Sequence, residues 1–332
     1  IPSGAAIGLK PNLVVAKAAE QGATTHPGII EGLIEYLLDN GYRDIYIMES
    51  SWVGESTERA FHMCGFDRLT KKYGIPFYDL KRDKTKSIDT PIGRIEVSQR
   101  ALDTDYLINL PVLKGHCQTG MTGALKNCKG CIPDKEKRRF HALGLHEPIA
   151  ALAAALKPAL TILDSICGDL NFEEGGTPVF TNRMLLGEDM VALDTLGCKL
   201  MGIDVNEVKY ISLAEKYGAG KASFSEEDII QINKPEGTAP NSQSGGLVKR
   251  LTRNVQQKEA CSACLGNLVH ALYRLEQEGI AFKFPLAIGQ GWRGKTFDGI
   301  GIGSCCDGAR VKVRGCPPSA EMIIKTLRES LK

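Results

Sequence analysis

Residues 6–9, 27–40 and 44–48 read AIGL, PGIIEGLIEYLLDN and DIYIM, and together they indicate the class of fold. The first and last of these runs are short and apolar, as buried strands are. The middle run spaces its apolar residues three or four positions apart, as one face of a helix does. Thr25 is the expected N-cap of this helix, and Pro27 suits its first turn. The order strand, helix, strand predicts two parallel strands joined by a crossover helix.

The same alternation continues to about residue 233. Further strands are expected at 106–110, 160–163 and 184–186. The helices expected between or after them cover 148–156, 190–201 and 205–216. Such a pattern favours an α/β fold, in which a mainly parallel sheet is layered between helices on both of its faces. Residues 1–233 are therefore expected to form one large α/β domain.

A change of composition follows this domain. Residues 234–257 are rich in Pro, Gly, Ser and Asn and then in basic residues, which is typical of a linker. Residues 258–332 are expected to form a small α/β module. Its expected helices are 268–278 and 319–331, and its expected strands are 284–288, 299–302 and 311–313.

Composition excludes several classes of partner. The chain has 332 residues, a formal net charge of +2 and acidic and basic residues interspersed, so we expect neither a nucleic-acid partner nor a membrane-surface patch. It lacks a run of about 18 uncharged apolar residues, which argues against a membrane span, and it shows no signal-peptide pattern. Its 11 cysteines are an odd number in a long chain and suit a reducing compartment, so we expect a cytoplasmic protein.

Four cysteines in the C-terminal module have the spacing of metal ligands. Cys261 and Cys264 form a CxxC pair at the turn into a helix, where backbone N–H groups favour the thiolate form. Cys305 and Cys316 each follow an expected strand, so their turns can face the first pair. Glycines and prolines beside them let the backbone approach a bulky inorganic group. We expect these four thiolates to bind a 4Fe-4S cluster.

Two alternatives remain open at this site. Structural zinc also uses four thiolates, but its ribbons commonly supply two tight CxxC pairs, and here ten residues separate Cys305 from Cys316. Cys306 could replace Cys305 as a ligand, although we expect it to be a packed thiol.

A dense polar stretch follows the strand expected at 106–110. Lys114, His116 and Lys126 are the candidate catalytic residues within it, because Lys neutralises an anion and His moves a proton. In open α/β sheets ligands bind beyond the carboxyl ends of the strands, so we expect a small anionic substrate or cofactor there. The competing interpretation is a solvated basic face with an ordinary loop histidine.

Other polar residues are expected at the same edge of the sheet. Lys10 and Asn12 follow the first strand, Thr25 and His26 open the first helix, and Asn127 ends the dense stretch. These five are the candidate cofactor-binding residues, since a helix N-terminus is a ready anion site. Simple capping of the helix explains Thr25 equally well.

Cys117, Cys128 and Cys131 raise the question of a second metal site. Three thiols with an open iron would suit cluster chemistry without electron transfer. The stronger alternative is that flanking lysines lower the pKa of these thiols and make them reactive without a metal.

Five motifs resemble those of one protein family. They are KPNL at 10–13, TTHP at 24–27, LPVLKGH at 110–116, TGALKN at 122–127 and GCPPS at 315–319. Over nearly its whole length the chain resembles the bacterial and archaeal family known as domain of unknown function 362. The resemblance implies an iron-sulfur or ferredoxin-associated protein but no particular reaction. The CxxCxxC runs of some members are missing from this sequence, so the resemblance does not imply two clusters in series.

Three functions follow from these observations, in order of preference. The first is an iron-sulfur oxidoreductase acting on a small anionic substrate or cofactor. The second is an electron-transfer or cluster-delivery protein that docks a redox partner protein and has no catalysis of its own. The third is a zinc-stabilised binding module.

Overall fold

A computed structural model describes residues 1–233, 244–280 and 283–331 of the chain. It divides into two compact units, Ile1–Gln243 and Ser244–Lys332. Residues 234–243 of the expected linker lie outside the described residues. Residues 244–257 are not a linker in this structure, because they contain helix α10 (Ser244–Leu251) and strand β11 (Val255–Gln257).

The large unit is built on a six-stranded sheet with the order β10-β9-β6-β1-β2-β3. Its strands are β1 (Ile7–Pro11), β2 (Ile45–Glu49), β3 (Phe77–Asp79), β6 (Tyr106–Leu110), β9 (Leu160–Asp169) and β10 (Pro178–Gly187). All neighbouring pairs are parallel except β9 and β10, which confirms the expected mainly parallel sheet. The chain adds β2 and β3 on one side of β1 and β6 and β9 on the other. The border between β1 and β6 is therefore the point where the strand order reverses.

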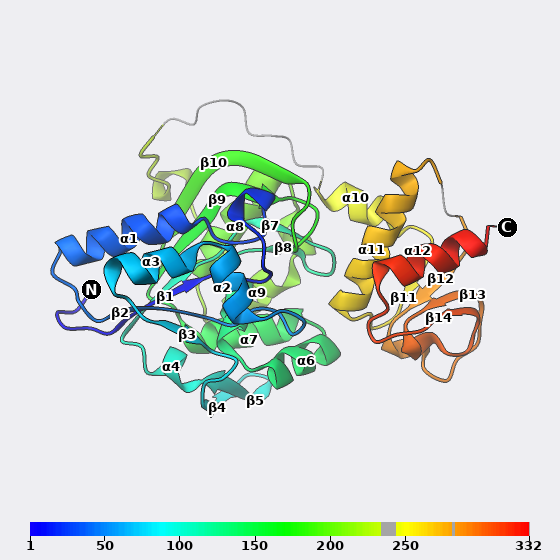
Figure 1. Cartoon of the computed structure of the whole chain (residues 1–332), viewed down its shortest axis with the longest axis horizontal. Helices are drawn as coiled ribbons and strands as arrows, with labels where there is room; N and C mark the ends of the chain where they lie inside the picture. Colours follow the sequence, from blue (N-terminus) through cyan, green and yellow to red (C-terminus); the bar gives the residue numbers. More distant parts are fainter. Residues whose placement is uncertain (234–243, 281–282, 332) are drawn as a thin grey trace. The chain divides into compact units, whose positions relative to one another are not determined.

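Helices cover both faces of this sheet, as expected (Figure 1). Strand β2 shows why, because its side chains alternate: Ile45 and Ile47 enter one hydrophobic core, and Tyr46 and Met48 enter the other. The first core packs helices α1 (Pro27–Asp39), α2 (Thr57–Met63) and α3 (Phe66–Tyr73). The second packs α5 (Ala124–Asn127), α7 (His146–Leu156), α8 (Met190–Met201) and α9 (Lys209–Lys216).

Several short elements of the large unit were not expected from the sequence. They are α4 (Gln99–Leu102), α6 (Asp134–Leu143), the hairpin of β4 (Thr85–Thr90) with β5 (Gly93–Ser98), and the hairpin of β7 (Lys114–His116) with β8 (Gly120–Thr122). The β7–β8 hairpin matters most here, because it holds two of the candidate catalytic residues.

The expected N-cap of α1 was wrong. The cap is His26, whose Nδ1 accepts a hydrogen bond from the Gly28 amide at 3.1 Å. The Thr25 hydroxyl instead accepts from the Asn12 amide at 2.7 Å and donates to the Leu110 carbonyl at 2.7 Å. Thr25 thus ties the loop before α1 to the ends of β1 and β6.

The small unit has a sheet of its own, in which β11, β12 (Leu286–Ile288), β13 (Phe297–Ile302) and β14 (Ala309–Val313) are parallel and adjacent in that order. Helices α11 (Ser262–Gln277) and α12 (Ala320–Glu329) contact each other, and α12 contacts β14. A small core of Ala287, Trp292 and Cys306 lies beside the turns that follow β12 and β13. The expected α/β character of the tail therefore matches the observed elements, with β11 as an unexpected first strand.

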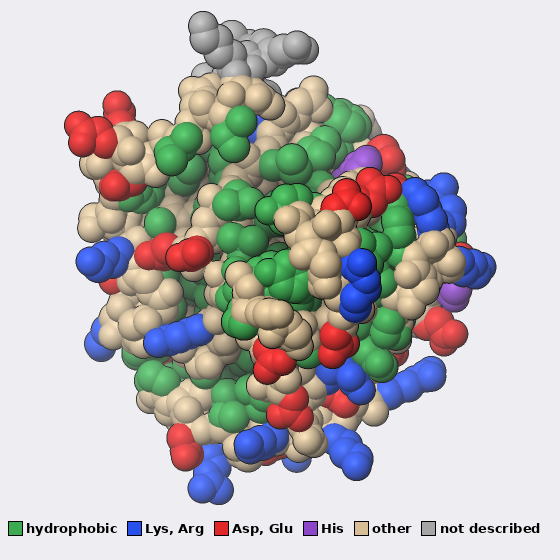
Figure 2. Space-filling view, turned by 90° about the vertical axis from the view of Figure 1, so that its left-hand side faces the viewer, with side chains coloured by type: hydrophobic (Ala, Val, Ile, Leu, Met, Phe, Trp, Pro, Cys, Tyr) green, Lys and Arg blue, Asp and Glu red, His purple; other side chains and the backbone are tan. Residues whose placement is uncertain are grey.

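One face of the molecule shows how its charges are distributed (Figure 2). Basic and acidic side chains alternate over this face, with hydrophobic side chains between them. In the described part of the chain, every helix is too short or too polar to cross a bilayer.

Candidate functional site

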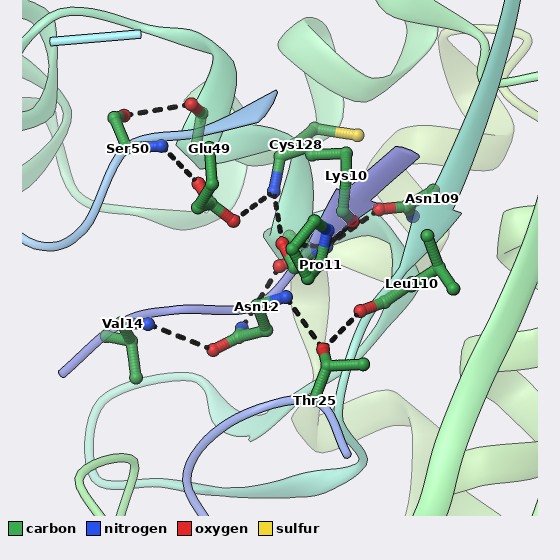
Figure 3. A network of polar contacts seen from close by, with 12 residues as sticks. Lys10, Pro11, Asn12, Val14, Thr25, Glu49, Ser50, Asn109, Leu110 and Cys128 are labelled. Carbon is green, nitrogen blue, oxygen red and sulfur yellow. Dashed lines mark hydrogen bonds and ion pairs between the residues drawn. The ribbon is translucent and has the colours of Figure 1, made fainter. Parts of the chain in front are cut away.

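The candidate site of the large unit lies at the carboxyl ends of β1 and β6, where the strand order reverses. Lys10 of β1 pairs in register with Asn109 of β6, so both side chains point to the same face of the sheet. Figure 3 shows these residues and their neighbours joined by a continuous set of polar contacts. Ligands of open α/β sheets bind at this kind of position.

Asn127 joins the two strand ends. Its amide nitrogen donates to Asn109 Oδ1 at 2.8 Å and to the Lys10 carbonyl at 3.3 Å, and its Oδ1 accepts from Asn12 Nδ2 at 3.0 Å. Asn109 in turn donates to the Ala124 carbonyl at 3.0 Å, at the start of α5. These amides are buried and satisfied within the chain, so they hold β1, β6 and α5 in one arrangement.

Lys10 is paired with a carboxylate that also lies at the carboxyl edge of the sheet. Its Nζ lies 2.7 Å from Glu49 Oε2, with side chains 1% and 3% exposed. Glu49 ends β2, which brings it beside Lys10 (Figure 3). Gly130 makes room for this pair, since a Cβ there would lie 1.8 Å from Glu49 Oε1 and 2.6 Å from Lys10 Nζ. The pair therefore needs glycine at position 130.

Lys114 is buried on the β7–β8 hairpin. Its Nζ donates to Asn12 Oδ1 at 3.2 Å and to the Ala23 carbonyl at 2.5 Å. Burial lowers the pKa of Lys114 to about 8. The hairpin register pairs Lys114 with Thr122, so both side chains share a face with His116. The Thr122 hydroxyl is buried and has no hydrogen-bond partner among the described residues.

His116 and Lys126 hold one carboxylate between them, that of Glu173. His116 Nε2 lies 3.0 Å from Glu173 Oε2, and Lys126 Nζ contacts Glu173 Oε1. His116 Nδ1 accepts from the backbone amides of Gln118 and Thr119 at 3.2 and 3.0 Å, so the ring proton lies on Nε2 and points at the carboxylate.

The charges of this trio follow from burial. Burial, with the nearby Lys126 charge, lowers the pKa of His116 to about 4, so the imidazole is neutral at physiological pH. Burial opposes ionisation of Glu173, but Lys126 and His116 outweigh it and hold the pKa of this carboxyl well below its usual range. Glu173 is therefore an anion held by one cation and one neutral N–H donor.

The loop that carries Glu173 joins β9 to β10. Asp169 closes it, because its carboxylate accepts from the amides of Asn171 and Thr177 at 2.8 Å each. The loop lies directly on the β7–β8 hairpin: a Cβ at Gly115 would lie 2.2 Å from the Leu170 carbonyl oxygen. Glycine at 115 thus permits the approach that brings Glu173 to His116.

Lys129 and His141 form a second basic pair beside this trio. Their side-chain nitrogens, Lys129 Nζ and His141 Nε2, lie 3.4 Å apart. Burial and the Lys126 charge lower the pKa of Lys129 to about 7. Burial and the Lys129 charge lower the pKa of His141 to about 2. Basic groups thus outnumber carboxylates at this end of the site.

The expected anion site at the start of α1 holds a carboxylate of the chain. Asp164 Oδ2 accepts from the His26 amide at 2.8 Å. The His26 side chain is 37% exposed and lies 3.9 Å from Glu20, away from the buried network. The structure therefore brings Lys10, Asn12, Thr25 and Asn127 together but leaves the His26 ring outside.

Sequence reasoning missed Glu173 as the partner of His116 and Lys126. The available signal was the position of Glu173-Glu174-Gly175-Gly176 shortly after a buried strand, at the same sheet edge as the candidate residues. Candidates were chosen for binding an anion, so a carboxylate of the chain itself was overlooked.

Cys128 and Cys131 pack inside the second core. Both are at most 1% exposed, and burial raises the pKa of Cys128 and raises that of Cys131 to about 12. Burial likewise raises the pKa of Cys117. The expectation that flanking lysines lower these pKa values was wrong, because desolvation of the thiolate outweighs the lysine charges.

Three of the four cysteines of the small unit lie on turns at one edge of its sheet, and Cys264 lies in the first turn of α11. Cys261 follows β11 and begins α11, Cys305 follows β13, and Cys316 follows β14. The last two turns are tied together, because the Ser304 amide donates to the Gly315 carbonyl at 2.9 Å. A Cβ at Gly303 would lie 3.7 Å from Cys264 Sγ. Burial and the nearby thiols of Cys261, Cys316 and Cys305 raise the pKa of Cys264 to about 12.

Polar side chains from the turn after β12 reach the same thiols. Gln290 Nε2 donates to Cys261 Sγ at 3.3 Å, and the nearby Cys305 thiol raises the pKa of the Arg293 guanidinium. Cys306 lies elsewhere: it is 2% exposed, and its Sγ faces the Ala287 carbonyl at 3.5 Å. Within residues 1–233, 244–280 and 283–331, no three His, Cys, Asp or Glu side chains are grouped closely enough to hold a single metal ion.

The large unit is thus a doubly wound α/β protein with a closed polar site at its switch point. The chain belongs to the family described as domain of unknown function (DUF362), whose model matches residues 7–199. That match covers the sheet from β1 to β10 and the candidate site, and it ends before the small unit.

The individual proteins that match this chain have low sequence identity to it. A thylakoid-associated protein of Synechocystis sp. is 26% identical over 217 residues, which are 63% of this chain and 67% of that protein. The lactate racemase apoprotein from Thermoanaerobacterium thermosaccharolyticum has a TM-score of 0.41 and 14% identity over 59% of this chain. A protein from Thermotoga maritima has a TM-score of 0.36 and 13% identity over 63% of this chain. The matches span 49% and 54% of those two solved chains, about half of their lengths.

Proposed function

We propose that this protein is an iron-sulfur protein, with a 4Fe-4S cluster bound by Cys261, Cys264, Cys305 and Cys316. The observation that supports the proposal is the gathering of three separate cysteine turns at one edge of the β11–β14 sheet. Four thiolates are the ligand set of such a cluster, and the cluster exchanges electrons one at a time when bound.

The residues around the thiols fit this group. Each thiolate of a 4Fe-4S cluster binds a different iron, so its ligands lie farther apart than the ligands of one ion. Gln290 supplies a hydrogen bond to sulfur and Arg293 a nearby positive charge, and both stabilise thiolates and tune the potential of a cluster. Cys306 points into the core instead, so we assign the third ligand to Cys305.

The large unit supplies the second half of the proposal, an oxidoreductase that acts on a small anionic substrate or cofactor. Lys126 would neutralise the anion and His116 would offer it the Nε2 proton, because both already face a carboxylate. Lys114 contacts Asn12 and the Ala23 carbonyl, so it would support the site rather than touch the ligand.

A specific observation also favours electron exchange with a redox partner protein. Cys316 is exposed, and Cys261, Cys264 and Cys305 are partly exposed. A cluster held by these residues would have an edge at the protein surface, which suits electron transfer to another protein. This second candidate needs no ligand in the large unit.

Metal analysis of protein purified without oxygen tests the cluster. We expect about four irons and four sulfides per chain and a visible absorption band that dithionite bleaches. Stoichiometric zinc without iron would instead support a zinc-stabilised module and overturn the proposal.

A pair of matched variants tests the ligand assignment. Cys316→Ser should lose iron and the visible band, whereas Cys306→Ala should keep both and lose only packing. Iron retained by the Cys316 variant, or lost by the Cys306 variant, would contradict the assignment. Anion binding to the large unit should be unchanged in both.

A further inference from the structure

We infer that His116 and Lys126 form a binding site for the carboxylate of a ligand, and that Glu173 occupies this site until the ligand displaces it. The inference deepens the proposed function and rests on its anion-binding half, because it names the chemical class of the ligand.

The first argument is that Glu173 is bound as a ligand would be. Its two oxygens are divided between two partners, His116 Nε2 on Oε2 and Lys126 Nζ on Oε1. Its side chain is 22% exposed, whereas those of His116 and Lys126 are 1% and 4% exposed. The partners are thus built into the protein, and the carboxylate is the most accessible member of the trio.

The second argument is that the partners are held in place without Glu173. His116 is oriented by the Gln118 and Thr119 amides on Nδ1. Lys126 belongs to α5, whose first amides, those of Ala124 and Leu125, are capped by Asp194 at 2.6 and 3.1 Å. Displacing Glu173 therefore leaves a positioned donor and cation behind, which is what a binding site requires.

The third argument is that this end of the site contains more basic and donor groups than one carboxylate satisfies. Lys129 and His141 adjoin the trio, and their contact is with each other. Thr122 lies on the same hairpin face as His116, and its buried hydroxyl lacks a hydrogen-bond partner within the part of the chain that the structure describes. A ligand with a carboxylate and a further polar group would satisfy these groups better than Glu173 alone.

The chemical class of the ligand follows from Glu173, the carboxylate that occupies the site in the structure. The site offers one neutral N–H, from His116, and one ammonium, from Lys126, which match the two oxygens and single charge of a carboxylate. A phosphate carries about two charges, whereas Glu173, the group that His116 and Lys126 hold in the structure, carries one. We therefore assign a small carboxylate rather than a phosphate.

Calorimetric titration of the full chain with acetate tests the inference. An internal competitor weakens the apparent affinity by the fraction of sites it occupies. Glu173→Ala should therefore bind acetate at least about 10-fold more tightly than the unmodified chain. Glu174→Ala is the control in the same loop, and because it leaves Glu173 in place its affinity should change far less than that of Glu173→Ala.

Two further variants keep the test decisive. Glu173→Asp serves if Glu173→Ala does not fold. It keeps the charge but shortens the side chain, so it should bind acetate more tightly than the unmodified chain. Adding Lys126→Met to Glu173→Ala should abolish acetate binding.

The outcomes separate this inference from the proposed function. Equal acetate affinity with and without the Glu173 carboxylate would overturn the displacement of Glu173 alone. Tighter binding of inorganic phosphate than of acetate, lost with Lys126→Met, would overturn the carboxylate class but keep an anion site. Saturable binding of neither anion by any variant would overturn both the inference and the anion-binding half, while the iron analysis would be unaffected.

Discussion

The two units place polar side chains at the same structural position, the carboxyl edge of a parallel sheet, but satisfy them differently. In the large unit each buried cation at the switch point faces a group of the chain itself: Lys10 faces Glu49, and Lys126 faces Glu173. In the small unit four thiols from three turns lie near one another, with Gln290 and Arg293 directed at two of them. Four thiols gathered beside one cation, Arg293, suit an added metal group, whereas paired groups form a site that is stable before its ligand binds.

Removal of the metal should have the largest effect, because it should destabilise the small unit and leave the large unit unchanged. A cluster that binds only the folded small unit stabilises it, so chelation should lower the midpoint of that unit by roughly 20 °C, equivalent to about 4 kcal/mol. The unfolding transition of the large unit should stay in place. Differential scanning calorimetry of the loaded and chelated protein would show this, and identical scans would contradict the proposed role of the thiols.

Replacing Lys10 tests whether the stability of the large unit depends on the pairing of its buried charges. Lys10→Met leaves the Glu49 carboxylate buried without its cation, which should cost about 3–5 kcal/mol of unfolding free energy. Urea unfolding measures the loss. The double variant Lys10→Met with Glu49→Leu removes both charges and should recover much of it. A loss below about 1 kcal/mol in the single variant would show that the pair behaves like an exposed one.

Acidification tests the neutral state of His116. Its folded-state pKa of about 4 lies below the ordinary value of 6.5, so the unfolded chain binds more protons between these values. Stability should therefore fall as the pH drops from about 6.5 to 4, by up to about 3 kcal/mol through this residue.

The matched variant His116→Gln should show a shallower loss over the same range, as measured by urea unfolding at several pH values. An unchanged slope would mean that folding leaves the pKa of His116 at its ordinary value, which would contradict a buried, neutral imidazole at this position.

The smallest expected effect concerns the hydroxyl that joins the strand ends. Thr25→Val removes the acceptor of the Asn12 amide and the donor to Leu110 while keeping the shape, which should cost about 2 kcal/mol. Thr85→Val, at an exposed position of β4, should stay within about 0.5 kcal/mol of the unmodified chain. Equal effects in chemical denaturation would show that the Thr25 contacts contribute little.

Much of the fold could be predicted because its signals are local. Alternation of apolar strands with amphipathic runs such as 27–40 indicated a parallel sheet between two helical layers, and both cores confirm it. The strand β11 and the hairpin β7–β8 were missed, because three-residue strands are too short to show a period and depend on their neighbours for pairing.

The sequence indicated some neighbours within the candidate site and missed others, again because only local patterns can be recognised in a sequence. Lys10, Asn12, Thr25 and Asn127 were expected together, and they are joined by hydrogen bonds. His26 was expected with them, yet its side chain lies outside because its ring caps α1. Glu173 was missed because its role depends on a loop that packs on Gly115, and no short-range pattern records that contact.

The sequence by itself determined the layered α/β class, the family and the spacing of the four cysteines, since these depend on periodicity and on motifs of a few residues. Only the tertiary structure decided which charge faces which. Glu49 and Lys10 are 39 residues apart, and Glu173 and Lys126 are 47 apart. The first pair forms because two parallel strands bring their carboxyl ends to one edge, and the second because the loop after β9 packs on the β7–β8 hairpin. Burial then sets their protonation, because the cost of removing a charge from water depends on the whole surrounding fold.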